Sequence, residues 1–242
     1  MVSQLVSAIA VTASIALAAL VIAGIAYAAR AERRPAARWI GGGAVAAWCG
    51  LAFVLARQGV FETDPDTTFA LIGPAIAIPV IAGCALLASD RARSVIARVP
   101  LHWLVGAQFY RVVGAIFLIA YLQDDIPGAF ALPAGIGDVL VGIAAPFAAL
   151  ALARRGVDRA WPLVTAWCAM GIADLVVAVS CGFLSAPSSF QQLALSEPNA
   201  AITSYPLVLI PVFAVPLSIV LHVFVLARLR PQRAGAARAR IA

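Results

Sequence analysis

The sequence predicts an all-α polytopic membrane protein, a seven-transmembrane-helix bundle with its amino terminus outside and its carboxyl terminus in the cytoplasm. The first observation behind this prediction is composition: of the 242 residues 63% are hydrophobic and 12% are charged, and the mean hydropathy is +0.99. A soluble domain has about 25% charged residues, so this chain lacks the polar side chains that coat a water-facing surface. The other two observations are apolar stretches of membrane-spanning length and the placement of the arginines.

Seven apolar stretches are long enough to cross a bilayer, which takes about 20 residues of helix. They lie at about 5–29, 39–57, 68–89, 101–123, 130–153, 161–184 and 204–228. The longest connecting segment, 185–203, is rich in turn-forming proline and serine and is too short for a separate soluble domain. We therefore expect one membrane domain over residues 1–230, followed by a basic cytoplasmic tail over residues 231–242.

The arginines predict the orientation of these spans. All seventeen basic residues are arginine, and fifteen of them follow the first, third, fifth or seventh stretch. By the positive-inside rule these segments are cytoplasmic, and Trp39, Trp103 and Trp161 begin spans on the same side. The opposite side carries the acids Glu62, Asp64, Asp66, Asp124, Asp125 and Glu197. Topology and attraction to anionic lipid headgroups thus explain the basic balance, and no nucleic-acid partner is expected.

The absence of lysine excludes several function classes. A retinal Schiff base, a pyridoxal phosphate aldimine and the phosphate-binding lysine of a P-loop all require that amine. The alanine- and arginine-rich composition is what a GC-rich genome encodes, and it predicts a bacterial inner (plasma) membrane.

Three ionisable residues fall inside the predicted spans, where each costs at least about 2.5–3.5 kcal/mol to insert. Arg111 lies about halfway along the fourth span, Asp138 in the outer half of the fifth and Asp174 near the middle of the sixth. At 1.5 Å per residue their depths below the outer face are about 18, 12 and 15 Å, so they can meet. We expect the guanidinium to be shared by both carboxylates, with Gln108 and Tyr110 beside it.

This expected centre has two interpretations. One positive and two negative charges leave a formal excess of −1, so one carboxylate has reason to hold a proton or bind a cation, which suits a proton relay. The alternative is a static ion pair that fixes helix packing. Small residues beside the charges, such as Gly135 and Gly142 near Asp138 and Gly114 near Arg111, permit that close packing.

A short echo joins the fifth and sixth spans. Residues 135–138 read Gly-Ile-Gly-Asp and residues 171–174 read Gly-Ile-Ala-Asp. Because the two spans run in opposite directions, the echo suits an inverted repeat of the kind found in transporters, although apolar-rich segments also match by chance.

The two histidines form a second set of candidates. His222 lies within the last span with Ser218 one turn away, and His102 lies at the cytoplasmic end of the fourth span. Both fall in the inner half of the bilayer, so a haem held by two histidines is conceivable, although no cofactor is evident otherwise. No further ligands accompany them, so no metal site is expected.

Prolines interrupt three of the predicted spans. In the last span Pro206, Pro211 and Pro216 recur every five residues. Each proline removes a backbone hydrogen bond, so we expect kinks that free carbonyl groups toward a cavity.

Three functions are compatible with these features. The first is a transporter or channel, proton-coupled or not, with Arg111, Asp138 and Asp174 at its centre and an acidic outer mouth that favours small cationic or neutral solutes. The second is a membrane-embedded enzyme or sensor that binds a lipid, quinone or haem through His222 and Tyr110. The third is an assembly partner without chemistry of its own. Whether the protein is an enzyme stays open.

Overall fold

The computed structural model describes residues 2–68 and 70–239, and side chains as far as residue 229. Within these residues it is all-helical, and no strand occurs. The helices are α1 (Gln4–Ala31), α2 (Pro35–Arg57), α3 (Ile72–Ala85), η1 (Leu86–Ala88), α4 (Asp90–Arg98), α5 (Leu101–Ala107), η2 (Gln108–Gly114), α6 (Ala115–Leu122), α7 (Gly128–Arg155), α8 (Val157–Ser185), η3 (Ala200–Thr203), η4 (Ile210–Ala214) and α9 (Val215–Ala239).

The all-α prediction is confirmed for the described residues, which hold six helices long and apolar enough to cross a membrane. These are α1, α2, the combined segment α5–η2–α6, α7, α8 and the segment Ile210–Leu229. A seventh crossing exists if Ile72–Ala88 and α4 count as one span, although the two meet at 96°. The third helix is thus shorter than the expected span 68–89, and the chain then turns across the bundle. Residues 240–242 of the expected tail lie outside the described residues.

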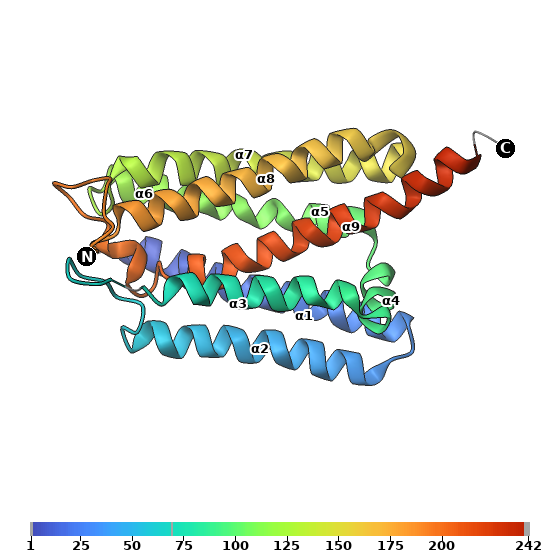
Figure 1. Ribbon diagram of the computed structural model, residues 1–242, viewed down its shortest axis with the longest axis horizontal. Helices are drawn as coiled ribbons and strands as arrows, with labels where there is room; N and C mark the ends of the chain where they lie inside the picture. The colour runs from blue at the N-terminus through green and yellow to red at the C-terminus, as the bar shows by residue number, and fades with distance from the viewer. Residues whose placement is uncertain (1, 69, 240–242) are drawn as a thin grey trace.

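The long helices lie side by side along one axis (Figure 1). The pair α1 and α2 forms one side of the bundle and the pair α7 and α8 the other, with α3, α5, α6 and α9 between them (Figure 1). The chain reverses at two ends. We call the end with segments 58–68, 70–71, 123–127 and 186–204 the acidic end, and the end with α4 and the carboxyl end of α9 the basic end.

Contacts between distant segments hold the basic end together. Arg98, the last residue of α4, donates from Nε to Oε2 of Glu32 over 2.5 Å. Arg228 of α9 donates to the carbonyl oxygen of Ile96 over 3.3 Å and also to that of Val99. Both carbonyls lie at the end of α4, where no further helical turn supplies N–H groups to them.

The middle of the fourth span is not the continuous α-helix that the apolar pattern predicts. Seven residues form the 3₁₀-helix η2, an unusually long run of this geometry. With three residues per turn, side chains three apart lie on one line, and Gln108, Arg111 and Gly114 are indeed the buried residues of this segment. The 3₁₀ geometry therefore presents Arg111 and its neighbours to a single face.

The last span also departs from α-helical geometry, at η4. These five residues form a π-helix that leads into α9. Pro211 and Pro216 lack an N–H group and interrupt the regular hydrogen-bond ladder here. The expected proline-rich break is thus observed, as a widened turn.

Buried apolar side chains form two clusters. One includes Val105, Trp167 and Leu221, and the other includes Phe117, Phe130 and Leu207. Along the fourth, fifth and sixth spans, Arg111, Asp138 and Asp174 lie in the interval between the two clusters.

Candidate functional site

Arg111 lies at the centre of the bundle and is 2% exposed. Its Nε donates to Oδ1 of Asp138 over 2.7 Å, and its Nη2 forms an ion pair with Oδ2 of Asp174. The three side chains come from η2, α7 and α8, so the structure brings together the residues whose similar depths in the bilayer allowed them to meet. Charged, hydrogen-bonded pairs of this kind are required because an isolated buried guanidinium is very costly.

The third nitrogen of the guanidinium joins His222 to the centre. Nη1 of Arg111 donates to the carbonyl oxygen of Gly171 over 3.1 Å and lies 3.4 Å from Nε2 of His222. A guanidinium has donors only, so Nε2 must be the acceptor and the neutral imidazole carries its hydrogen on Nδ1. That Nδ1 is buried and has no hydrogen-bond partner among the described residues. The indole ring of Trp167 packs against the imidazole at a centroid distance of 4.7 Å, with the two ring planes tilted by 50°.

Three glycines make room for this packing. A Cβ at Gly137 would overlap the carboxylate of Asp174, and one at Gly114 would overlap Asp138. A Cβ at Gly171 would lie 2.5 Å from Nε2 of His222. Because each glycine lies where a side chain of the centre passes, these positions allow three helices to close around Arg111.

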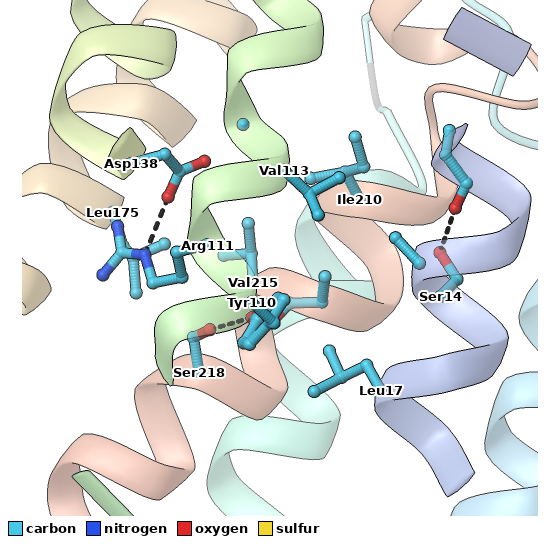
Figure 2. Close-up of a pocket in the computed structure, with 14 residues that line it drawn as sticks. Ser14, Leu17, Tyr110, Arg111, Val113, Asp138, Leu175, Ile210, Val215 and Ser218 are labelled. Atoms are coloured by element: carbon cyan, nitrogen blue, oxygen red, sulfur yellow. Dashed lines mark hydrogen bonds and ion pairs between the residues drawn. The ribbon is translucent and has the colours of Figure 1, made fainter. Parts of the chain in front are cut away.

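Each carboxylate uses one oxygen in the centre and keeps the other unpaired. Among the described residues no hydrogen bond reaches Oδ2 of Asp138 or Oδ1 of Asp174. Figure 2 shows the second oxygen of Asp138 directed away from Arg111, toward the side of Val113 and Ile210. The centre therefore has a formal charge of −1 and a carboxylate oxygen available to another donor.

A small cavity of about 40 Å³ adjoins this oxygen (Figure 2). The polar residues in its wall are Arg111, Asp138, Tyr110, Ser218 and Ser14, and the other lining residues are apolar. A space of this size admits a few water molecules, since about 10–15 Å³ is enough for one.

A second cavity of about 270 Å³ meets the first at Asp138. The two share four lining residues, Asp138, Leu175, Ile210 and Val215. The larger cavity lies between α3, α8 and η4 and reaches the acidic end, where Thr63, Ser188 and Thr203 line it. Its wall is largely apolar along its length. Asp138 is thus the charged group at the junction of two cavities, whereas Asp174 lines neither.

A chain of hydroxyl and amide groups leads from the small cavity toward the basic end. The hydroxyl of Tyr110 lies 3.1 Å from the carbonyl oxygen of Ala214 and is also hydrogen-bonded to Oγ of Ser218. Oγ of Ser218 lies 3.3 Å from Oε1 of Gln108. Two hydroxyl hydrogens serve three contacts, so the chain has two arrangements. Tyr110 donates either to Ser218 or to Ala214, and Ser218 correspondingly donates to Gln108 or to Tyr110.

The structure leaves His102 apart from this centre. His102 lies in α5 with its ring edge-on to Trp103, at a centroid distance of 6.3 Å. No contact among the described residues joins it to His222 or Arg111. The same residues contain no group of three or more histidine, cysteine, aspartate or glutamate side chains that could hold a metal ion.

The sequence prediction put Tyr110 beside Arg111 and set His222 and Ser218 apart as a second group, whereas in the structure His222 lies against Arg111 and Ser218 is hydrogen-bonded to Tyr110. It also missed the carbonyl of Gly171 and the ring of Trp167. The sequence did contain one signal, the repeated Gly-Ile-x-Asp motif. Its first glycine packs against the span that carries Arg111 in both copies: Gly135 lies near the carbonyl oxygen of Gly114, and Gly171 lies near Nη1 of Arg111.

Comparisons with known proteins give a family and no function. Neither curated proteins nor solved structures provide a match to this chain. The family match covers residues 82–230, more than half of the chain and all the residues of the arginine centre. The chain belongs to the family described as Domain of unknown function (DUF8737).

Proposed function

We propose that this protein is a proton-coupled membrane transporter for a small cationic or neutral solute, with Arg111, Asp138 and Asp174 as its centre. The observation that carries the proposal is the environment of Asp138. One of its oxygens is bound to Arg111, and the other faces the junction of a small and a large cavity. A purely structural ion pair has no need of either cavity.

The charges supply a reason for coupling. Arg111 neutralises one of its two carboxylate partners, so the centre retains one negative charge inside an apolar bundle. A proton or a bound cation on Asp138 removes that excess, and both compete for the same oxygen. Asp174 remains the fixed counter-charge because it lines neither cavity.

The solute and the proton reach Asp138 by different paths. The large cavity gives a solute access from the acidic end. The small cavity and the chain of Tyr110, Ser218 and Gln108 give a proton a route toward the basic end. Because the chain ends at the amide of Gln108, whose Nε2 donates back to the carbonyl oxygen of Ser218, the proton must pass from the hydroxyls to water on its way to the basic end.

The charge distribution also supports a location and an orientation. We place the protein in a bacterial inner membrane with its amino terminus outside and its basic end in the cytoplasm, against anionic lipid headgroups. The acidic end then forms an outer mouth that raises the local concentration of cations.

The pocket for a lipid, quinone or haem is the second candidate, favoured by the apolar wall of the large cavity. Quinone carbonyls accept hydrogen bonds, and the carboxylate of Asp138 in that wall is also an acceptor, so the hydroxyls of Thr63, Ser180, Ser188 and Thr203 are the donors left for a quinone among the described lining residues. For a haem, Nε2 of His222 already faces Arg111. The cavity therefore suits a ligand that donates or carries positive charge better than either of these.

The experiment is proton movement in proteoliposomes with an acidic lumen and a pH dye inside. We expect the lumen to become more alkaline when at least one of sodium, choline, benzyltrimethylammonium or urea is supplied. Asp138→Asn should abolish this response, whereas Asp158→Asn, the same change at an exposed position of α8, should retain it.

Two results contradict the proposal. One is a lumenal pH that does not respond to any of the four solutes in wild-type protein. The other is an equal response in Asp138→Asn. Reconstitution is checked by equal amounts of folded wild-type and variant protein in the vesicles.

A further inference from the structure

The large cavity has a composition that favours one class of solute. Of the residues that the structure describes, three phenylalanines line it, Phe117, Phe130 and Phe183, and the rings of Phe117 and Phe130 meet edge to face at a centroid distance of 5.0 Å. The remaining wall is mainly aliphatic, from Ile72, Ile76 and Val179. At about 270 Å³ the cavity has room for a small organic molecule and more than a hydrated metal ion needs.

The charged end of the same cavity is a single carboxylate. Among the described residues, Asp138 is the one ionisable residue in its lining, and its side chain is 14% exposed. An anionic ligand would be repelled here, and a neutral apolar ligand would leave the free oxygen unpaired. A cation satisfies that oxygen, and phenylalanine faces attract organic cations as well.

We propose that the large cavity binds a lipophilic monovalent cation, an organic ammonium, with its charge against Asp138 and its apolar body among Phe117, Phe130 and Phe183. This inference rests on the proposed function, because it names the solute class for the same centre. The acidic end raises the local concentration of such cations, because Glu62, Asp64 and Asp66 lie beside Thr63 in the chain, and Thr63 lines the cavity.

The exchange balances in charge. One proton leaves Oδ2 of Asp138 as one ammonium ion approaches it, and the ion pairs of Arg111 stay intact. The centre has the same total charge before and after the exchange of one proton for one monovalent cation.

The binding test uses benzyltrimethylammonium, which is permanently charged and cannot cross as a free base. Calorimetry on the full chain in lipid nanodiscs should show affinity that weakens with acidity, by up to about tenfold per pH unit, as one competing proton requires. Titration in two buffers of different ionisation enthalpy should show proton release on binding. Benzyl alcohol, with the same ring and no charge, should bind at least about tenfold more weakly.

Two variants separate the charge from the aromatic wall. Asp138→Asn should lower the affinity for benzyltrimethylammonium at least tenfold and abolish proton release, whereas Asp158→Asn should change neither. Phe183→Leu should lower the affinity severalfold and keep proton release. Phe183 is 46% exposed, so this variant is expected to fold even if Asp138→Asn does not.

The outcomes distinguish this inference from the proposed function. Three results would overturn the cation site. They are equal affinity for benzyltrimethylammonium in Asp138→Asn and wild type, an affinity that does not change with pH, and binding of benzyl alcohol as tight as that of benzyltrimethylammonium. If proton movement in vesicles still depends on Asp138 with another solute, the transporter proposal stands while the cation site fails. If benzyltrimethylammonium binds as described and no proton or solute crosses, the cation site stands while transport fails.

Discussion

Gly137 of α7 lies directly against the carboxylate of Asp174 on α8, and no side chain fits between them. Gly137→Ala would therefore push Asp174 away from Arg111 or separate the two helices. We expect the variant to lose about 1–3 kcal/mol of stability, as overpacking does, measured by thermal unfolding in detergent.

Gly43→Ala is the matched control, because a Cβ at Gly43 of α2 meets no atom within 4 Å. Alanine favours helix by up to about 1 kcal/mol over glycine, so this variant should be as stable as wild type or more stable. Equal stability of the two alanine variants would contradict the close packing around Asp174.

Removal of the arginine should be far more damaging than removal of the whole charged centre. Arg111→Met leaves two carboxylates, with side chains 14% and 10% exposed, without their partner and should cost about 3–5 kcal/mol. The triple variant Arg111→Met, Asp138→Asn, Asp174→Asn should recover most of this loss. Thermal unfolding and yield of folded protein measure both effects.

The same triple variant tests whether the centre has only a structural role. We expect it to fold and to lose all solute-dependent proton movement. If it transported protons as wild type does, the ion pairs would serve helix packing alone.

The hydroxyl chain predicts a separation of binding from proton transfer. Tyr110→Phe removes the group that links the small cavity to Ser218. Proton movement should slow at least about tenfold, while affinity for benzyltrimethylammonium stays unchanged. The lost hydrogen bonds should cost only about 0.5–1.5 kcal/mol.

Tyr121→Phe, at a partly exposed position of α6, should leave the rate of proton movement unchanged. An unchanged rate in Tyr110→Phe as well would remove this tyrosine from the proton route.

The ion pair at the basic end predicts a pH dependence of stability. The hydrogen bond from Arg98 holds the pKa of Glu32 below its ordinary value. A carboxyl whose pKa is lower in the folded protein stabilises it above the ordinary pKa, and this contribution disappears as pH falls through the folded-state pKa. Glu32→Gln should therefore melt at a lower temperature than wild type at about pH 7 and equally at strongly acidic pH.

Glu197→Gln, at an exposed position of the acidic end, should show no such difference at either pH. A stability difference for Glu32→Gln that stays constant across the pH range would mean that its ion pair with Arg98 does not carry the effect.

The sequence was sufficient for six of the long apolar helices, though not for the bend after Ala88, and for the meeting of Arg111 with two aspartates. Hydropathy reports which segments tolerate lipid, and a constant rise per residue converts position in a span into depth. Because ionisable groups at similar depth in an apolar bundle must pair, Arg111, Asp138 and Asp174 had few possible partners other than one another.

The remaining features depend on packing, which a single sequence does not encode in a readable pattern. The 3₁₀ geometry of η2 goes with the close approach of α7, where Gly142 lies against the backbone of Val112. The position of His222 depends on how η4 widens the start of α9 and how Gly171 admits the ring. Neither follows from the apolar period of its own helix.

The 3₁₀ geometry also makes η2 longer than an α-helix of the same seven residues would be. A 3₁₀-helix rises about 2.0 Å per residue and an α-helix about 1.5 Å, so conversion of these seven residues to α-helix would shorten the span by about 3.5 Å. It would also rotate α5 against α6 and take Gln108, Arg111 and Gly114 off their common line. A small number of backbone hydrogen bonds in one segment thus controls both the reach of the arginine and the axial position of the two helices beside it.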